Sequence, residues 1–200
     1  KHVSLLQLDL LALTKLKDTG ECEFSVPEVL FDLDFPGHYF RRIKNVGVSV
    51  PCVAGPYIGL SSTLTLLSSK LRVRSTPVVQ GCGDAQNFRQ SSLPTQSIAT
   101  STGQNDAGVF ELNFRDDRYL PFEGAGAIGS WRLAMPETFR PFDYATISDV
   151  VLHIRYTARD AGGLLKRAAG RVFLAGASDN PDHRNVDGRR RAGARCSRGA

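Results

Sequence analysis

The segment from Gly103 to Pro136 places two short alternating stretches on either side of a connection rich in charge, aromatics and glycine. The stretches are Val109–Phe114 and Ser130–Met135, and in each of them apolar and polar residues alternate. Because successive side chains of a strand point to opposite faces, each stretch predicts a strand with one buried face. The whole segment therefore predicts two strands joined by an ordered loop.

Several other stretches have the same character. The predicted strands are Glu21–Val26, Val29–Phe35, Tyr39–Val53, Leu60–Arg74 and Ser148–Thr157. Turn signals such as Pro36-Gly37 and Gly55-Pro56 separate them. Strands do not alternate with helices, which excludes a doubly wound parallel sheet. The sequence predicts an all-β fold, an antiparallel β-sandwich with one N-terminal helix and long loops.

Two local features refine this prediction. The apolar phase of the strand Tyr39–Val53 shifts between Ile43 and Val46, which predicts a β-bulge near Gly47. Residues 75–103 are polar and contain several prolines and glycines, so we expect a long connection there.

The N-terminal helix is predicted over Ser4–Lys17, where leucines recur at helical spacing. Ser4 can cap its start and Gly20 can end it. Leu6 and Leu10 widen the apolar stripe, so we expect this helix to be covered on more than one side.

Charge divides the chain into unequal parts. The chain has 200 residues, with 25 basic and 20 acidic side chains; from residue 166 onward there are nine basic and three acidic ones, leaving 16 and 17 before it. We predict an N-terminal helix over 1–20, a β-sandwich over 21–165 and a disordered basic tail over 166–200. A nearly neutral sandwich argues against a nucleic-acid-binding domain, which concentrates cations on a folded face.

Composition and motifs argue against several other classes of protein. The four cysteines, Cys22, Cys52, Cys82 and Cys196, are too widely spaced for a disulfide scaffold or a zinc site. No apolar run reaches the ~20 residues that a membrane-spanning helix needs, so we expect no membrane insertion by this segment. The N-terminus has no signal-peptide pattern. Motifs for nucleophilic hydrolysis, phosphate binding or dinucleotide binding are also missing, so we expect no enzyme and no cofactor.

Paired carboxylates are the remaining chemical candidates, because β-sandwich glycosidases use two of them and calcium sites use several. The candidates are Asp32 with Asp34, Asp116 with Asp117, and Glu123. Asp32 and Asp34 alternate along a predicted strand and would both face solvent. Asp116 and Asp117 lie between two arginines in a turn that neutralises itself. Both glycoside hydrolysis and calcium binding are therefore disfavoured, and we expect no catalytic or metal residues.

Four long strings carry a resemblance to a known family. They are FDLDFPGHYFRRIKNVGVSVPCVAGPY (31–57), TLTLLSSKLR (63–72), STGQNDAGVFELNFRDDRYLPFEGAGAIGSWRL (101–133) and FDYATISDVVLHIRYTAR (142–159). They resemble the C-terminal TcB-binding domain of the A subunit (TcA) of bacterial ABC-type insecticidal toxin complexes, the Tc toxins. The resemblance extends from residue 4 to about residue 169, and fails in the arginine-rich end.

The resemblance implies a function without catalysis. In such secreted, pore-forming toxins the A subunit is a homopentamer, and its C-terminal domains form the platform on which the cocoon of B and C subunits docks. Residues 1–20 would then lead from the channel region, and the partners would be the B subunit (TcB) and neighbouring A subunits.

We expect the partner-binding residues in the loop after Val109–Phe114, where charge can steer docking and an aromatic side chain can anchor it. They are Arg115, Asp116, Asp117, Arg118 and Tyr119. The alternative is a carbohydrate- or receptor-binding β-sandwich that uses Tyr57, Tyr119 or Trp131 as a platform.

Overall fold

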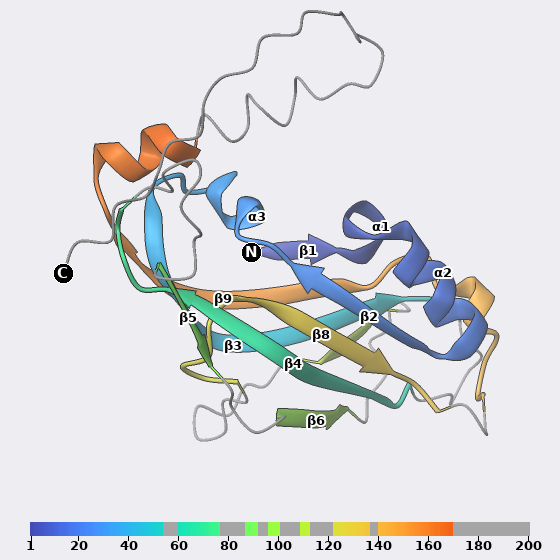
Figure 1. Cartoon of the computed structure of the whole chain (residues 1–200). Helices are drawn as coiled ribbons and strands as arrows, with labels where there is room; N and C mark the ends of the chain where they lie inside the picture. The colour runs from blue at the N-terminus through green and yellow to red at the C-terminus, as the bar shows by residue number, and fades with distance from the viewer. Residues whose placement is uncertain are drawn as a thin grey trace, which may run out of the picture.

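The computed structural model describes residues 1–53, 60–76, 87–91, 96–100, 109–112, 122–136 and 140–169. In these residues two antiparallel sheets pack face to face, one of four strands and one of five (Figure 1). The predicted all-β antiparallel sandwich is therefore confirmed.

The four-stranded sheet, called sheet A, has the order β1-β9-β3-β7. Its central pair is β3 (His38–Pro51) and β9 (Val151–Asp160), with β1 (His2–Ser4) and β7 (Val109–Leu112) at its edges. β1 was not predicted. It pairs with β9 from His2↔His153 to Ser4↔Val151, so the first residues of the chain belong to the sandwich.

The five-stranded sheet, called sheet B, has the order β2-β8-β4-β5, with β6 also paired to β4. Its strands are β2 (Glu21–Val26), β8 (Ile128–Ala134), β4 (Ser62–Arg72), β5 (Phe88–Ser91) and β6 (Gln96–Thr100). β5 and β6 occupy the stretch for which we expected only a long connection. Their sequences are polar and short, so the apolar alternation that indicates a strand is missing from them.

The core lies between the two sheets. Trp131 of β8 is fully buried (0% exposed) and meets Phe122 edge-to-face, with ring centroids 5.1 Å apart. Leu152 and Ile154 of β9 face it from sheet A, as their alternation predicts. Cys22 is buried here too, and burial raises the pKa of its thiol to about 12.

The N-terminal helix is real but divided. α1 (Leu5–Leu8) and α2 (Leu10–Thr19) are separated at Asp9, which has extended backbone angles. Asp9 ends α1 and caps α2, since its Oδ1 accepts a hydrogen bond from the N–H of Ala12 at 3.0 Å. Ser4 caps α1 and Gly20 ends α2 at φ 81°, as predicted.

The outer side of these helices is open within the described residues. Leu6 and Leu10 are exposed and Leu11 is 81% exposed. The expectation that this helix is covered on more than one side is therefore wrong for this chain. The buried side of the two helices is formed by Leu5, Leu13 and Leu16, and α2 packs against β2 of the sandwich.

Residues 29–35 are not a strand, contrary to the prediction. Val29–Asp32 forms the single helical turn α3, which buries Phe31 between the ends of the two sheets. The Phe31 ring meets Tyr156 edge-to-face at 5.1 Å. The strand interpretation failed because the alternation of apolar and acidic residues is too short here to indicate a strand. The same pattern suits a helical turn that buries only one large side chain.

The predicted bulge in β3 exists, but at another position. The register of β3 and β9 shifts between Ile43 and Asn45 and again between Tyr39 and Arg42. Neither shift lies at Gly47, which pairs regularly with His153.

Residues 163–169 form a helical segment that crosses the predicted boundary at 165/166, and Leu165 is buried in it. The division of the chain at 20/21 and 165/166 stays a prediction.

Candidate functional site

The loop predicted to bind the partner, Arg115 to Tyr119, lies outside the described residues. The residues that bracket it are defined. Leu112 pairs with Val48 of β3, and the N–H of Gly124 donates to the carbonyl of Ile43 at 2.9 Å. The described residues on either side of the predicted loop are therefore both hydrogen-bonded to β3.

An ion-pair cluster joins the two sheets beside α3. Glu28 accepts hydrogen bonds from Arg41 of β3 at 3.1 Å and from Arg72 of β4 at 2.8 Å. Arg41, only 2% exposed, also contacts the carboxylate of Asp32 and the carbonyl of Phe35 at 3.4 Å. Two arginines thus face two carboxylates, and the cluster is balanced in charge.

This cluster accounts for one of the predicted carboxylate pairs. Burial raises the pKa of Asp32, while the hydrogen bond from Arg41 opposes that shift. Asp34 binds elsewhere, to the Lys1 Nζ at 2.9 Å. On a strand, Asp32 and Asp34 would both have faced solvent, as predicted from the sequence. The helical turn instead directs Asp32 to Arg41 and Asp34 to Lys1.

The bulge that directs Arg41 inward sets Phe40 in an unusual conformation. Phe40 has φ 54°, in the left-handed region that bulky residues rarely adopt. Its ring lies between two guanidinium groups, with the Cζ of Arg42 4.6 Å and that of Arg159 4.5 Å from the ring centroid. These cation–π contacts hold both arginine heads on the outer surface of sheet A.

Phe40 and its two arginines belong to a larger basic surface. We call Phe40, Arg42, Lys44, Arg155 and Arg159 the cationic ribbon. Its four cations are exposed, on the part of the β3–β9 pair that neither β1 nor β7 reaches. The stretches 39–45 and 155–159 contain no carboxylate. The ribbon therefore concentrates positive charge on a sandwich that is nearly neutral as a whole.

Apolar side chains lie at the same end of the sandwich. Leu33 and Phe35, directly after α3, are exposed, and so is Leu164 in the helical segment 163–169. That segment lies against the α3–β3 turn, since a Cβ on Gly37 would come within 2.9 Å of the Lys166 Cβ (Figure 1). Exposed apolar and arginine side chains close together are typical of protein–protein contact surfaces.

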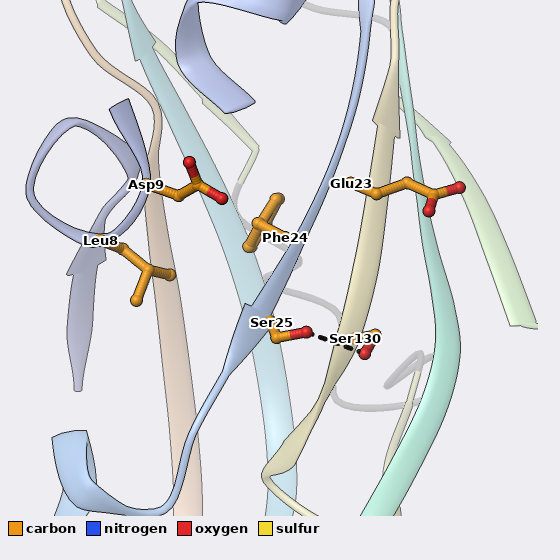
Figure 2. A pocket seen from close by; sticks show the side chains of 6 residues that line it. All are labelled: Leu8, Asp9, Glu23, Phe24, Ser25 and Ser130. Atoms are coloured by element: carbon orange, nitrogen blue, oxygen red, sulfur yellow. Dashed lines mark hydrogen bonds between the residues drawn. The ribbon is translucent and has the colours of Figure 1, made fainter. Parts of the chain in front are cut away.

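A shallow depression of about 280 Å³ lies elsewhere, between the α1–α2 break and β2 (Figure 2). Its polar groups are already engaged, because Asp9 caps α2 and the hydroxyls of Ser25 and Ser130 lie 3.0 Å apart. Figure 2 shows the Glu23 carboxylate pointing away from Asp9, so the two acids do not face a common substrate position. The depression offers no catalytic pair.

Trp131 is fully buried, so it is not a sugar-binding platform; Tyr57 and Tyr119 lie outside the described residues, as do Asp116 and Asp117. Glu123 is exposed. Within the described ranges, no three His, Cys, Asp or Glu side chains are grouped to hold a metal ion. In the same residues, none of the helices has the length and apolar character needed to cross a membrane.

Comparison with known proteins decides the family. A profile described as "Tc toxin complex TcA C-terminal TcB-binding domain" matches residues 1–158, which include both sheets and the cationic ribbon except Arg159. The chain belongs to this TcB-binding domain family. By its description the family is a binding domain of Tc toxin complexes, and it is not a known class of enzyme.

Individual relatives are much longer. Toxin subunit YenA2 of Yersinia entomophaga is 40% identical over 153 residues, which cover 73% of this chain and 11% of YenA2. A cryo-EM structure of Yersinia pseudotuberculosis TcaA-TcaB is 27% identical, with TM-score 0.48, over 80% of this chain and 10% of that chain. Morganella morganii TcdA4 is 22% identical, with TM-score 0.45, over 80% and 7% respectively. The chain thus spans about a tenth of the relatives it matches.

Sequence reasoning about this TcB-binding domain missed the ion-pair cluster and the ribbon. The alternation of β3 gave no signal for the ribbon, because Phe40 and Ile43 are three residues apart and face opposite sides, as in a regular strand. The partners of Arg41 and Arg72 gave no signal either, because Glu28 is distant from both along the chain.

Proposed function

We propose that this chain is the domain through which the A subunit of a Tc toxin binds the B subunit, so that the B–C cocoon docks on the A subunit. The family match carries the proposal, since it covers residues 1–158, which include all the described strands except the last two residues of β9. The exposed basic and apolar surface around Phe40 supports it, because a binding domain needs such a surface.

The same proposal covers the assembly. We infer that the full-length A subunit is a secreted homopentamer, that five copies of this domain form the platform, and that the domain itself carries no catalytic activity. The loop 115–119 stays a predicted contact, and its bracketing residues lie beside β3, where the ribbon is also found.

The test is direct binding of the purified 200-residue chain to the cognate B subunit or B–C cocoon, measured by interferometry. We expect saturable binding that weakens as salt rises from about 50 to about 300 mM, because the proposed surface is charged. A glycan array serves as the second arm. Glycan binding by a chain that has no measurable affinity for the B subunit would reject the proposal.

A further inference from the structure

We infer that the cationic ribbon is the contact surface for a carboxylate-rich surface of the B subunit, with Phe40 as the residue that positions its arginines. This inference rests on the proposed function and goes beyond it, because it names both the surface and the chemistry of its partner.

The cationic ribbon carries an excess of positive charge. Arg42, Lys44, Arg155 and Arg159 are exposed, and the stretches that carry them contain no acid. The nearest described carboxylate along β9, Asp160, accepts a hydrogen bond from the N–H of Gly162 at 2.9 Å. The four cations of the ribbon therefore outnumber the one carboxylate of β3 and β9, and a partner with Asp and Glu side chains would complement the excess positive charge.

The Phe40 ring positions two of the arginines before any partner binds. An exposed arginine usually samples many rotamers and loses that freedom when it binds. Here the Phe40 ring is in contact with the heads of Arg42 and Arg159, at 4.6 and 4.5 Å. The ring occupies that position only because Phe40 accepts a left-handed backbone at φ 54°. Preorganised guanidinium groups suit carboxylates, which they bind through two parallel hydrogen bonds.

The surroundings favour a protein over another polyanion. Leu33, Phe35 and Leu164 are exposed at the same end of the sandwich and add apolar area to the basic one. A phosphate backbone gains its affinity from cations and has no use for such a rim. An anionic membrane can use both kinds of contact, and the description of the family as a TcB-binding domain is what favours a protein partner over it. A protein surface can use both kinds of contact.

The experiment compares charge-reversed chains in the B-subunit binding assay. The main variant is Arg42→Glu with Arg159→Glu. The control is Lys15→Glu with Lys70→Glu, which changes the net charge equally at exposed sites on α2 and β4. We expect the main variant to bind at least about tenfold more weakly, mostly through slower association, and the control to bind like the wild type.

A second variant protects the test against misfolding. Lys44→Glu with Arg155→Glu reverses the other two cations and leaves the contacts of the Phe40 ring with Arg42 and Arg159 in place. It should also bind about tenfold more weakly while keeping the wild-type unfolding midpoint. Phe40→Leu, which keeps an apolar side chain but no aromatic face, should weaken binding about threefold and leave its salt dependence unchanged.

The outcomes separate the two proposals. If the wild type binds and the ribbon variants bind equally well, the ribbon inference is wrong and the proposed function stands. If the wild type does not bind the B subunit, both fail. If anionic phosphatidylserine vesicles or a single-stranded oligonucleotide bind as tightly as the B subunit, with the same loss in the ribbon variants, the partner is a general polyanion and the inference is overturned.

Discussion

Arg72 of β4 holds the carboxylate of Glu28 with two donors, Nε at 2.9 Å from Oε1 and Nη2 at 2.8 Å from Oε2. The same carboxylate accepts from Arg41 of β3 at 3.1 Å. One acidic side chain before α3 therefore links an arginine of sheet A to an arginine of sheet B. This end of the sandwich is closed by charge as well as by Phe31.

Glu28→Gln should destabilise the fold strongly. It leaves two buried guanidinium groups with one carboxylate, and breaking a buried pair costs about 3 kcal/mol or more. Urea unfolding followed by Trp131 fluorescence measures this loss. Glu21→Gln is the matched control, because the Glu21–Arg132 pair is exposed and surface pairs contribute little. Equal losses in the two variants would show that the cluster has no special role.

Phe40→Gly should be more stable than Phe40→Ala. Both variants lose the ring and its contacts with the two arginines, so they differ only in the backbone. At φ 54° a residue with a Cβ is strained by about 1 kcal/mol relative to glycine. Chemical denaturation of the pair gives this difference directly. An alanine variant at least as stable as the glycine variant would contradict the left-handed conformation.

Gly126→Ala should disrupt the packing of the residues before β8 against β4. A Cβ at this position would lie 2.1 Å from the carbonyl oxygen of Lys70, which is a backbone atom and cannot swing away. We expect a loss of about 3 kcal/mol, at the upper end for overpacking, in the same unfolding assay. Gly163→Ala is the control, since nothing lies within 4 Å of its Cβ, and it should be neutral or slightly stabilising.

Cys22 should be protected in the folded chain. Burial raises the pKa of this thiol from 9.0 to about 12, so the folded state keeps its proton where the unfolded state loses it. Stability should accordingly decrease between about pH 9 and 12, and the decrease should be smaller in Cys22→Ala. At pH 8, iodoacetamide should label Cys22 slowly in a variant whose other cysteines are serine, and quickly in urea. Fast labelling of the native protein would show an exposed thiol.

Much of the sandwich could be predicted from alternation, because a strand buried on one face shows its pattern in the sequence itself. β3, β4, β8 and β9 were found in this way, and so were the caps at Ser4 and Gly20. β5 and β6 were missed since their residues are polar. α3 was misassigned because four residues are too few to distinguish a helical turn from a strand.

The sequence alone determined the fold class, the family resemblance and the near neutrality of the first 165 residues, since each of these depends on local pattern or composition. Tertiary structure decided which charges meet. Glu28 lies 44 residues from Arg72, and Phe40 lies far along the chain from Arg159, yet each pair is in contact. The register between β3 and β9, with shifts beside Tyr39 and Ile43, sets the contact of Phe40 with Arg159, whereas the position of α3 beside β4 sets that of Glu28 with Arg72. Register is a property of two paired strands, so the sequence of either strand alone does not predict it.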